Sequence, residues 1–187
     1  MQMQTLDEVY MNKLKDLYDA ENQIIEALPK MGRAAASEEL KEAFLKHLEQ
    51  TKGQLMRLDE VFDMLGASAG NRQCVGMRGL LEEGEDLLNG QERGPALDAA
   101  LIAAAQSVEH YEIANYGSVQ TWARELGHTE AADLLEETLE EERQADEELT
   151  ELAETLINPG ASTTDEIDAE SESVDTEAEE VDSSEEA

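Results

Sequence analysis

Apolar residues recur at helical spacing along four long segments of this 187-residue chain, and this periodicity limits the fold more than any other feature. The segments cover residues 5–35, 37–65, 97–126 and 129–157, and a shorter amphipathic stretch covers residues 77–88. Apolar positions three and four residues apart form one face of a helix, whereas the alternation typical of strands is nearly absent. The sequence therefore predicts an all-α fold.

Turn and capping signals separate the four segments. Thr5–Glu8 fits a capping box at the start of the first, Gly66 and Gly127 follow the second and third, and Pro29 could kink or end the first. Helices of roughly 30 residues, about 45 Å long, pack most simply as an up-down four-helix bundle. The one long connection, with its short helix, would cross over the bundle as in the ferritin-like architecture.

Three glutamates lie at the centres of apolar stripes. At about 100° per residue, neighbouring apolar residues fall within about 40° of Glu21, Glu112 and Glu142 on three different predicted helices. All three side chains are therefore predicted to point inward. An ionised carboxylate in a core costs several kcal/mol unless a cation meets it, and converging carboxylates also repel one another. This pattern favours a metal site.

Other polar residues would complete the same layer. The inward stripe of the second helix carries His47, Thr51 and Gln54, and an imidazole nitrogen or an amide oxygen can bind a metal ion. Glu109 and Asp146 lie one turn from Glu112 and Glu142, and no Lys or Arg lies near the stripe centres. Carboxylates mixed with imidazole suit iron or manganese, and in helical bundles they bridge two ions. The predicted metal ligands are Glu21, His47, Gln54, Glu109, Glu112, Glu142 and Asp146.

Each of these residues also has a simpler interpretation. A single glutamate in an apolar stripe is more often on a misjudged face, or is protonated and hydrogen bonded. His47 alone is more often a buried histidine with ordinary partners than a metal ligand. His110 is predicted to lie almost opposite Glu112, and His128 to lie at a helix junction, so neither is a candidate ligand. The prediction of a metal site depends on all three glutamates lying at the centres of the apolar stripes of their helices.

The net charge of −33 restricts the partners of the chain. Such a surface repels nucleic-acid phosphate and anionic lipid, so direct binding to nucleic acid or to a membrane is not expected. Residues 165–186 carry 12 acids and no Lys or Arg. This composition predicts a disordered acidic tail over residues 158–187, which would follow a helical domain over residues 1–157. The rest of the chain still carries −21, which favours a high-salt, halophilic cytoplasm.

Cysteine usage and hydropathy indicate the compartment. Cys74 is the single cysteine of the sequence, so an internal disulfide and a cysteine zinc site are both excluded. There is no basic and then apolar leader at the start of the sequence, and no apolar run near 18 residues. A cytoplasmic protein is expected.

Several blocks of sequence resemble one known family. Residues 16–21, 27–31, 47–54, 103–114 and 139–142 are closely similar to the YciF/YciE-type ferritin-like stress proteins. The resemblance covers about residues 5–157. It implies a ferritin-like four-helix bundle with an added short helix, a dinuclear metal site and expression linked to stress. The chain departs from the usual ferritin-like pattern of Glu-x-x-His on two helices, because Thr51–Gln54 and Glu142–Ala145 contain no histidine.

Two functions of different classes follow. The first is a metal-binding protein that holds one or two iron or manganese ions and oxidises Fe(II) with dioxygen or peroxide, which would remove reagents that generate radicals. The second is a structural or partner-binding stress protein whose bundle has no productive metal chemistry. Iron storage in a shell finds little support in the sequence, and a homodimer formed through an outer helix face is compatible with it.

Overall fold

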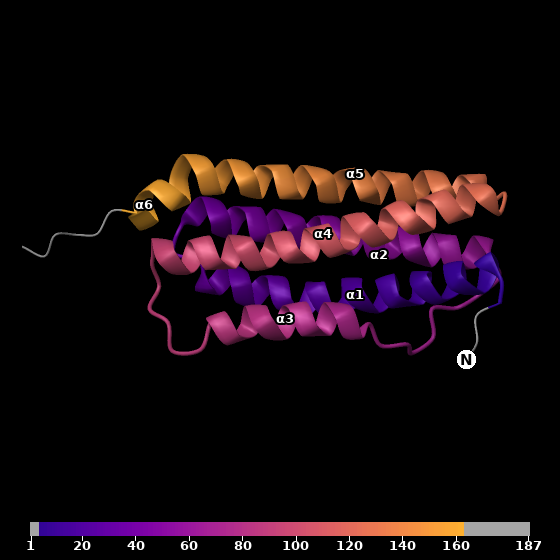
Figure 1. Cartoon of the computed structure of the whole chain (residues 1–187), viewed down its shortest axis with the longest axis horizontal. Coiled ribbons are helices and arrows are strands. Elements are labelled where there is room, and N and C mark those ends of the chain that lie inside the picture. Colours follow the sequence, from indigo (N-terminus) through magenta and orange to yellow (C-terminus); the bar gives the residue numbers. More distant parts are fainter. Residues whose placement is uncertain (1–3, 163–187) are drawn as a thin grey trace, which may run out of the picture.

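The computed structural model describes residues 4–162 and shows a bundle of four long helices with a short helix packed against its side (Figure 1). The long helices lie side by side along the longest axis of the molecule. They are α1 (Leu6–Ala34), α2 (Glu38–Met64), α4 (Pro95–Glu125) and α5 (Thr129–Leu152), and the short helix is α3 (Val75–Leu87). The predicted all-α bundle with an additional short helix is confirmed.

Neighbouring long helices run antiparallel to each other. The chain passes along α1, back along α2, and then returns through the long connection that contains α3 before α4 begins (Figure 1). Helix α1 packs against α2 and α4, while α5 packs against α2 and α4. The connection that contains α3 lies over α1 and α4, so it is the crossover of the ferritin-like architecture.

Local capping explains where the helices begin and end. The Thr5 side chain accepts a hydrogen bond from the Glu8 N–H, and the Ser37 side chain caps α2 in the same way. Gly66 and Gly127 have φ angles of 61° and 83°, and the residue after each glycine donates its N–H to a carbonyl five residues back. Glycine adopts this left-handed conformation without strain, so it ends α2 and α4.

Pro29 does not end the first helix, and a wide turn extends the helical chain beyond residue 157. Pro29 lies inside α1, which continues to Ala34. A π-helical turn, η1 (Ala153–Ile157), leads into α6 (Asn158–Ser162), so helical structure continues for five residues beyond the boundary predicted after residue 157. Pro159 is compatible with α6 because proline lacks an N–H, and residues in the first turn of a helix need no N–H for an internal bond. The remainder of the predicted tail lies outside the described residues.

The core consists of two apolar clusters. The α6-end cluster surrounds Leu28, Leu40, Phe44, Leu101 and Leu149, and the turn-end cluster, near the α4–α5 turn, surrounds Tyr10, Leu14, Leu58, Val119 and Leu135. On every long helix, buried polar residues lie between the residues that belong to one cluster and those that belong to the other. The bundle therefore has a polar layer across its middle.

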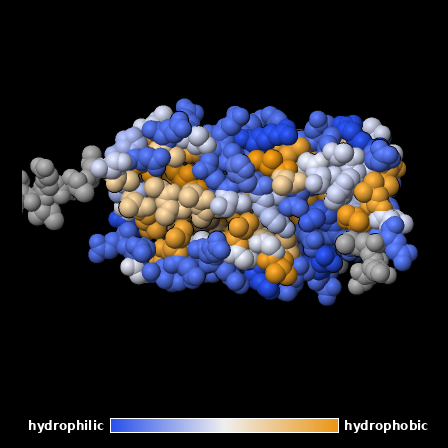
Figure 2. Space-filling view, in the orientation of Figure 1, coloured by the Kyte–Doolittle hydropathy of each residue, from blue (hydrophilic) through white to orange (hydrophobic). Residues whose placement is uncertain are grey.

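The surface is mostly hydrophilic, as the net charge of −33 requires. Figure 2 shows one face on which an apolar patch lies over the first half of α4, where the exposed or half-buried residues include Ala96, Ala100 and Ala103. Within residues 4–162, no helix is both long enough and apolar enough to cross a membrane.

Candidate metal centre

The central layer is built from buried polar side chains on all four long helices. Glu21 comes from α1, Glu109 and Glu112 from α4, and Glu142 from α5, and each is at most 3% exposed. Helix α2 contributes His47, Thr51 and Gln54, and all three are buried. The inward orientation predicted for the three stripe-centre glutamates is confirmed.

Four of these side chains converge on one point. His47, Glu109, Glu112 and Glu142 each offer a ligand atom, and the four atoms lie within 4.8 Å of one another. The His47 Nε2 atom is 3.4 Å from a Glu109 carboxylate oxygen and 3.7 Å from a Glu142 carboxylate oxygen. Ligands about 2.2 Å from a shared ion are at most about 4.4 Å apart. The group is thus close to the size that one metal ion requires.

Hydrogen bonding in the layer is incomplete. Among the described residues, nine buried side-chain nitrogen or oxygen atoms have no hydrogen-bond partner, and eight of them belong to this layer. They are Glu21 Oε2, both ring nitrogens of His47, Gln54 Oε1, Glu109 Oε2, Glu112 Oε1 and both carboxylate oxygens of Glu142. Buried polar atoms without partners are uncommon and need an explanation, such as an ion or a water molecule.

Burial and mutual repulsion change the acidity of the glutamates. Desolvation is the largest cause and raises the pKa of Glu21, Glu112 and Glu142 well above the usual range of a glutamate. The negative charge of Glu142 raises the pKa of Glu21 further. The charges of Glu21 and Glu142 together raise the pKa of Glu112. Desolvation also raises the pKa of Glu109 to about 7. A layer without a bound cation therefore retains protons near neutral pH, and a cation would replace them.

Tyr116 holds one side of Glu21. Its hydroxyl donates a hydrogen bond to Glu21 Oε1, and the tyrosine is fully buried. Desolvation and the charges of Glu21 and Glu112 raise the pKa of Tyr116, so the phenol stays protonated and remains a donor. Sequence analysis did not identify this role, although Tyr116 follows Glu112 by four residues on the same face of α4.

An arginine approaches the layer from the edge of the bundle. Arg57 on α2 pairs with Glu141 and donates from Nε to Thr138 Oγ1 at 3.0 Å, and Glu141 also accepts a hydrogen bond from Gln54 at 3.1 Å. The positive charge of Arg57 lowers the pKa of Glu21 slightly against the larger effect of burial. The prediction that no Lys or Arg lies near the stripe centres did not anticipate Arg57, whose long side chain reaches inward from the flank of α2.

Asp146 lies at the edge of the layer and outside the group of four. Its Oδ1 accepts a hydrogen bond from Gln106 Nε2 at 3.0 Å, and its Oδ2 lies 3.3 Å from His110 Nε2. These contacts use both carboxylate oxygens. Of the seven predicted ligands, the structure thus brings four together, places Glu21 and Gln54 beside them, and leaves Asp146 with other partners.

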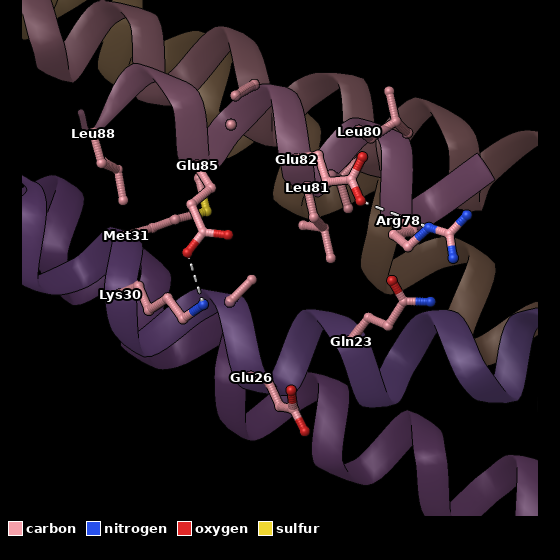
Figure 3. Close-up of a pocket in the computed structure, with 14 residues that line it drawn as sticks. Gln23, Glu26, Lys30, Met31, Arg78, Leu80, Leu81, Glu82, Glu85 and Leu88 are labelled. Atoms are coloured by element: carbon pink, nitrogen blue, oxygen red, sulfur yellow. Dashed lines mark hydrogen bonds and ion pairs between the residues drawn. The ribbon is translucent and has the colours of Figure 1, made fainter. Parts of the chain in front are cut away.

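A separate groove lies between α1, α3 and α4 and has a volume of about 260 Å³. Figure 3 shows Lys30 facing Glu85 across it, and Arg78 beside Glu82. These rim charges pair with each other over an apolar floor that includes Met31 and Leu81. The groove does not contain any of the seven predicted ligands.

The comparisons with known proteins match nearly all of the described chain. The model of a family described as a domain of unknown function, DUF892, matches residues 5–162. The chain belongs to this family. Protein YciF of Escherichia coli strain K12 is 47% identical over 162 residues, which cover 86% of this chain and 98% of YciF. The residues matched by the family model, 5–162, include every helix described above.

Solved structures agree with this assignment. The crystal structure of the E. coli stress protein YciF matches with a TM-score of 0.80 at 46% identity, covering 83% of this chain and 99% of that one. YcfI from Rhodopseudomonas palustris, described as a candidate structural protein, matches with a TM-score of 0.77 at 40% identity, covering 80% and 95%. The chain is thus a YciF-type stress protein by family, and the resemblance seen in the sequence is confirmed.

Proposed function

We propose that the central layer binds one or two iron or manganese ions and that the protein uses this site in protection against oxidative stress. The observation that carries the proposal is the set of eight unpartnered polar atoms in the layer. A fold that only needed to fill its core would place apolar side chains there, because unpartnered buried polar groups cost free energy.

The side chains present fit such ions. Four carboxylates and one imidazole lie in or beside the group, and this mixture of oxygen and nitrogen ligands suits iron and manganese better than softer metals. The four glutamates would supply up to four negative charges to balance one or two divalent cations. The layer has fewer histidines than the usual ferritin-like pattern. This difference favours weaker binding of the ion.

Each residue has a proposed role. His47, Glu109, Glu112 and Glu142 would be the primary ligands because their atoms already converge. Glu21, which Tyr116 holds at Oε1, would present its unpartnered Oε2 to a second ion, and Gln54 would offer its unpartnered Oε1. Asp146 would act from the edge of the layer and would have to leave Gln106 to do so.

Bound iron or manganese would supply one-electron redox chemistry, which the side chains themselves do not provide. In the proposed reaction Fe(II) is the substrate, and dioxygen or peroxide from solution accepts its electrons. The two apolar clusters exclude bulk water from both ends of the layer. The raised pKa values of the glutamates mean that the layer would release protons to solvent as it takes up cations.

Elemental analysis by ICP-MS tests the proposal. The full-length protein is purified natively in high salt, without an affinity tag or chelator, beside the triple variant Glu21→Gln, Glu112→Gln and Glu142→Gln. A matched control carries Glu26→Gln, Glu125→Gln and Glu147→Gln, which are exposed glutamates on the same three helices. We expect near-stoichiometric iron or manganese in the wild type and the control, and loss of the metal in the inner triple variant.

A non-catalytic structural or partner-binding role is the second candidate. It draws support from the raised pKa values, since protonated glutamates can remain buried without a metal, and from the description of the similar protein YcfI as a candidate structural protein. Oxygen-electrode assays with Fe(II) separate the two candidates. The redox proposal predicts that the wild type consumes dioxygen and that the inner triple variant does not. If the wild type binds neither Fe(II) nor Mn(II) under anaerobic reconstitution, the structural role is favoured.

A further inference from the structure

A small cavity lies beside the central layer, between α2, α4 and α5. Its volume is about 20 Å³, and its inner end is formed by His47 and Glu109. Both residues are more than nine-tenths buried, and both ring nitrogens of His47 and Oε2 of Glu109 have no hydrogen-bond partner. Two side chains with unpartnered polar atoms therefore line this cavity, which we call the passage, although those atoms are themselves buried.

A wider hollow of about 480 Å³ lies next to this passage, between α2 and α5. Ala43 and Glu148 line both the passage and the hollow, so the two are adjacent. Four glutamates line the hollow, on both helices: Glu39, Glu42, Glu148 and Glu151. One cation, Lys46, is also present and binds both carboxylate oxygens of Glu148, at 2.5 and 2.7 Å.

The geometry points to this hollow as a second, outer cation-binding site, from which divalent metal ions pass between Ala43 and Ala145 to reach His47 and Glu109. This inference rests on the proposed function, because a route is needed only if the central layer takes up metal. The hollow carries four carboxylates against one ammonium group, so it attracts divalent cations before they enter the bundle. Glu148, which lines both spaces, passes the ion from one to the other.

Small side chains and a displaceable lysine make the route usable. Ala43 and Ala145 form part of the wall of the passage, and neither extends beyond a methyl group. Lys46 is exposed, so an arriving divalent cation can replace it on Glu148 without opening the core. Lysine is a flexible cation that forms only weak surface ion pairs, which suits a group that must move aside.

The neighbouring approach to the layer between α2 and α5 is closed by side-chain bonds. Arg57 pairs there with Glu137 and Glu141, and Gln54 donates to Glu141. The Arg57 side chain is 16% exposed, whereas Lys46 is 55% exposed. An ion approaching beside Arg57 would meet a fixed positive charge, whereas an ion approaching beside Lys46 meets one that can swing away.

Rapid mixing of metal-free full-length protein with Mn(II) tests the route. The rate of uptake is followed by loss of the EPR signal of free Mn(II), and the final Mn(II) content by ICP-MS. In the blocking variant, Ala43→Leu with Ala145→Leu, we expect slower uptake with the same final content as the wild type. Ala104→Leu is the matched control, because it enlarges a half-buried alanine in the remote α1–α3–α4 groove.

Surface charge variants provide a second test that does not disturb the core. Glu148→Gln with Glu151→Gln should slow Mn(II) uptake by about tenfold at low ionic strength and less in high salt, because electrostatic attraction is screened. Lys46→Gln should accelerate uptake, since it removes the competing cation. The exposed pair Glu125→Gln and Glu147→Gln, which lines neither space, should leave the rate unchanged.

The outcomes separate the route from the site. The route would be overturned if the blocking variant and the Glu148/Glu151 variant both took up Mn(II) at the wild-type rate and to the normal final content. The central site would remain intact in that case. A wild type that binds no Mn(II) would overturn the proposed function and the route together. Slower uptake in both variants, with faster uptake in Lys46→Gln, would establish the route.

Discussion

The central polar layer and the apolar clusters on either side of it are equally buried but differ in what their burial achieves. Leu14, Leu101 and Leu135 are at most 2% exposed and surrounded by other apolar side chains, so their burial stabilises the bundle. Glu21, Glu112 and Glu142 are as deeply buried but leave carboxylate oxygens without partners. The ends of the bundle therefore stabilise the fold, and the middle is available for a ligand.

A buried acid outside the central layer shows that this chain can supply hydrogen-bond donors to a carboxylate when the fold requires it. Asp98 on α4 is 1% exposed, and its two oxygens accept hydrogen bonds from the backbone N–H groups of Ala36 and Ser37 at 2.7 and 2.8 Å. It thereby ties the α1–α2 connection to α4. Among the described residues, eight of the nine buried polar atoms without partners lie in the central layer, so the missing partners are concentrated there.

The largest effect on stability should come from the apolar clusters. Leu101→Ala should lower the free energy of unfolding by about 2–5 kcal/mol, because it removes buried apolar surface and leaves a cavity. Urea denaturation of the metal-free protein measures this change. A loss no greater than that of an exposed substitution such as Met56→Ala would mean that the clusters do not carry the stability.

Substitution of Asp98, the buried acid outside the layer, should have the next largest effect on the free energy of unfolding. Asp98→Asn replaces one of the two accepting oxygens with an amide nitrogen that cannot accept the N–H of Ala36 or Ser37. We expect a loss of about 1–3 kcal/mol in the free energy of unfolding. The same denaturation experiment measures it, and unchanged stability would remove the contrast between Asp98 and the layer.

Substitution in the layer should act in the opposite direction. In metal-free protein at about pH 8, the Gln variant of Glu21, Glu112 and Glu142 should be more stable than the wild type by about 1 kcal/mol, since it removes the desolvation and mutual repulsion of three buried carboxyl groups. The variant of Glu26, Glu125 and Glu147 changes the net charge equally and controls for surface repulsion. Destabilisation of the inner variant alone would show that the glutamates have a structural role.

The pH dependence of stability should show a smaller effect of the same origin. Burial raises the pKa of Glu109 from 4.5 to about 7, so in this range the folded protein holds a proton that the unfolded chain releases. The free energy of unfolding of metal-free protein should therefore fall as pH rises from about 4.5 through 7. Denaturation curves in the presence of EDTA measure this slope. It should be shallower in the inner triple variant, and stability that rises with pH would contradict the account.

Periodicity was sufficient to predict the helices and the inward glutamates. Each stripe contains enough apolar residues to fix which face of its helix is buried, so Glu21, Glu112 and Glu142 could be placed by angle alone. Gly66 and Gly127 marked helix ends because few other residues adopt a positive φ without strain. These features depend on residues close together in the sequence.

Contacts between helices could not be predicted in the same way. The hydrogen bond from Tyr116 to Glu21 and the reach of Arg57 toward Glu141 depend on the axial offset of neighbouring helices, which periodicity does not determine. Asp146 was a reasonable ligand by spacing, but Gln106 and His110 engage it in the folded chain. Helix α6 follows a π-helical turn that no local sequence signal indicated.

Anomalous diffraction from crystals of the full-length protein grown with Mn(II) tests the central claim most directly, because it locates the ion. The account predicts one or two strong anomalous peaks within ligand distance of His47, Glu109, Glu112 and Glu142, which vanish in the inner triple variant. Manganese found only on the outer acidic surface, with ordered water or protonated carboxyl groups in the layer, would contradict it.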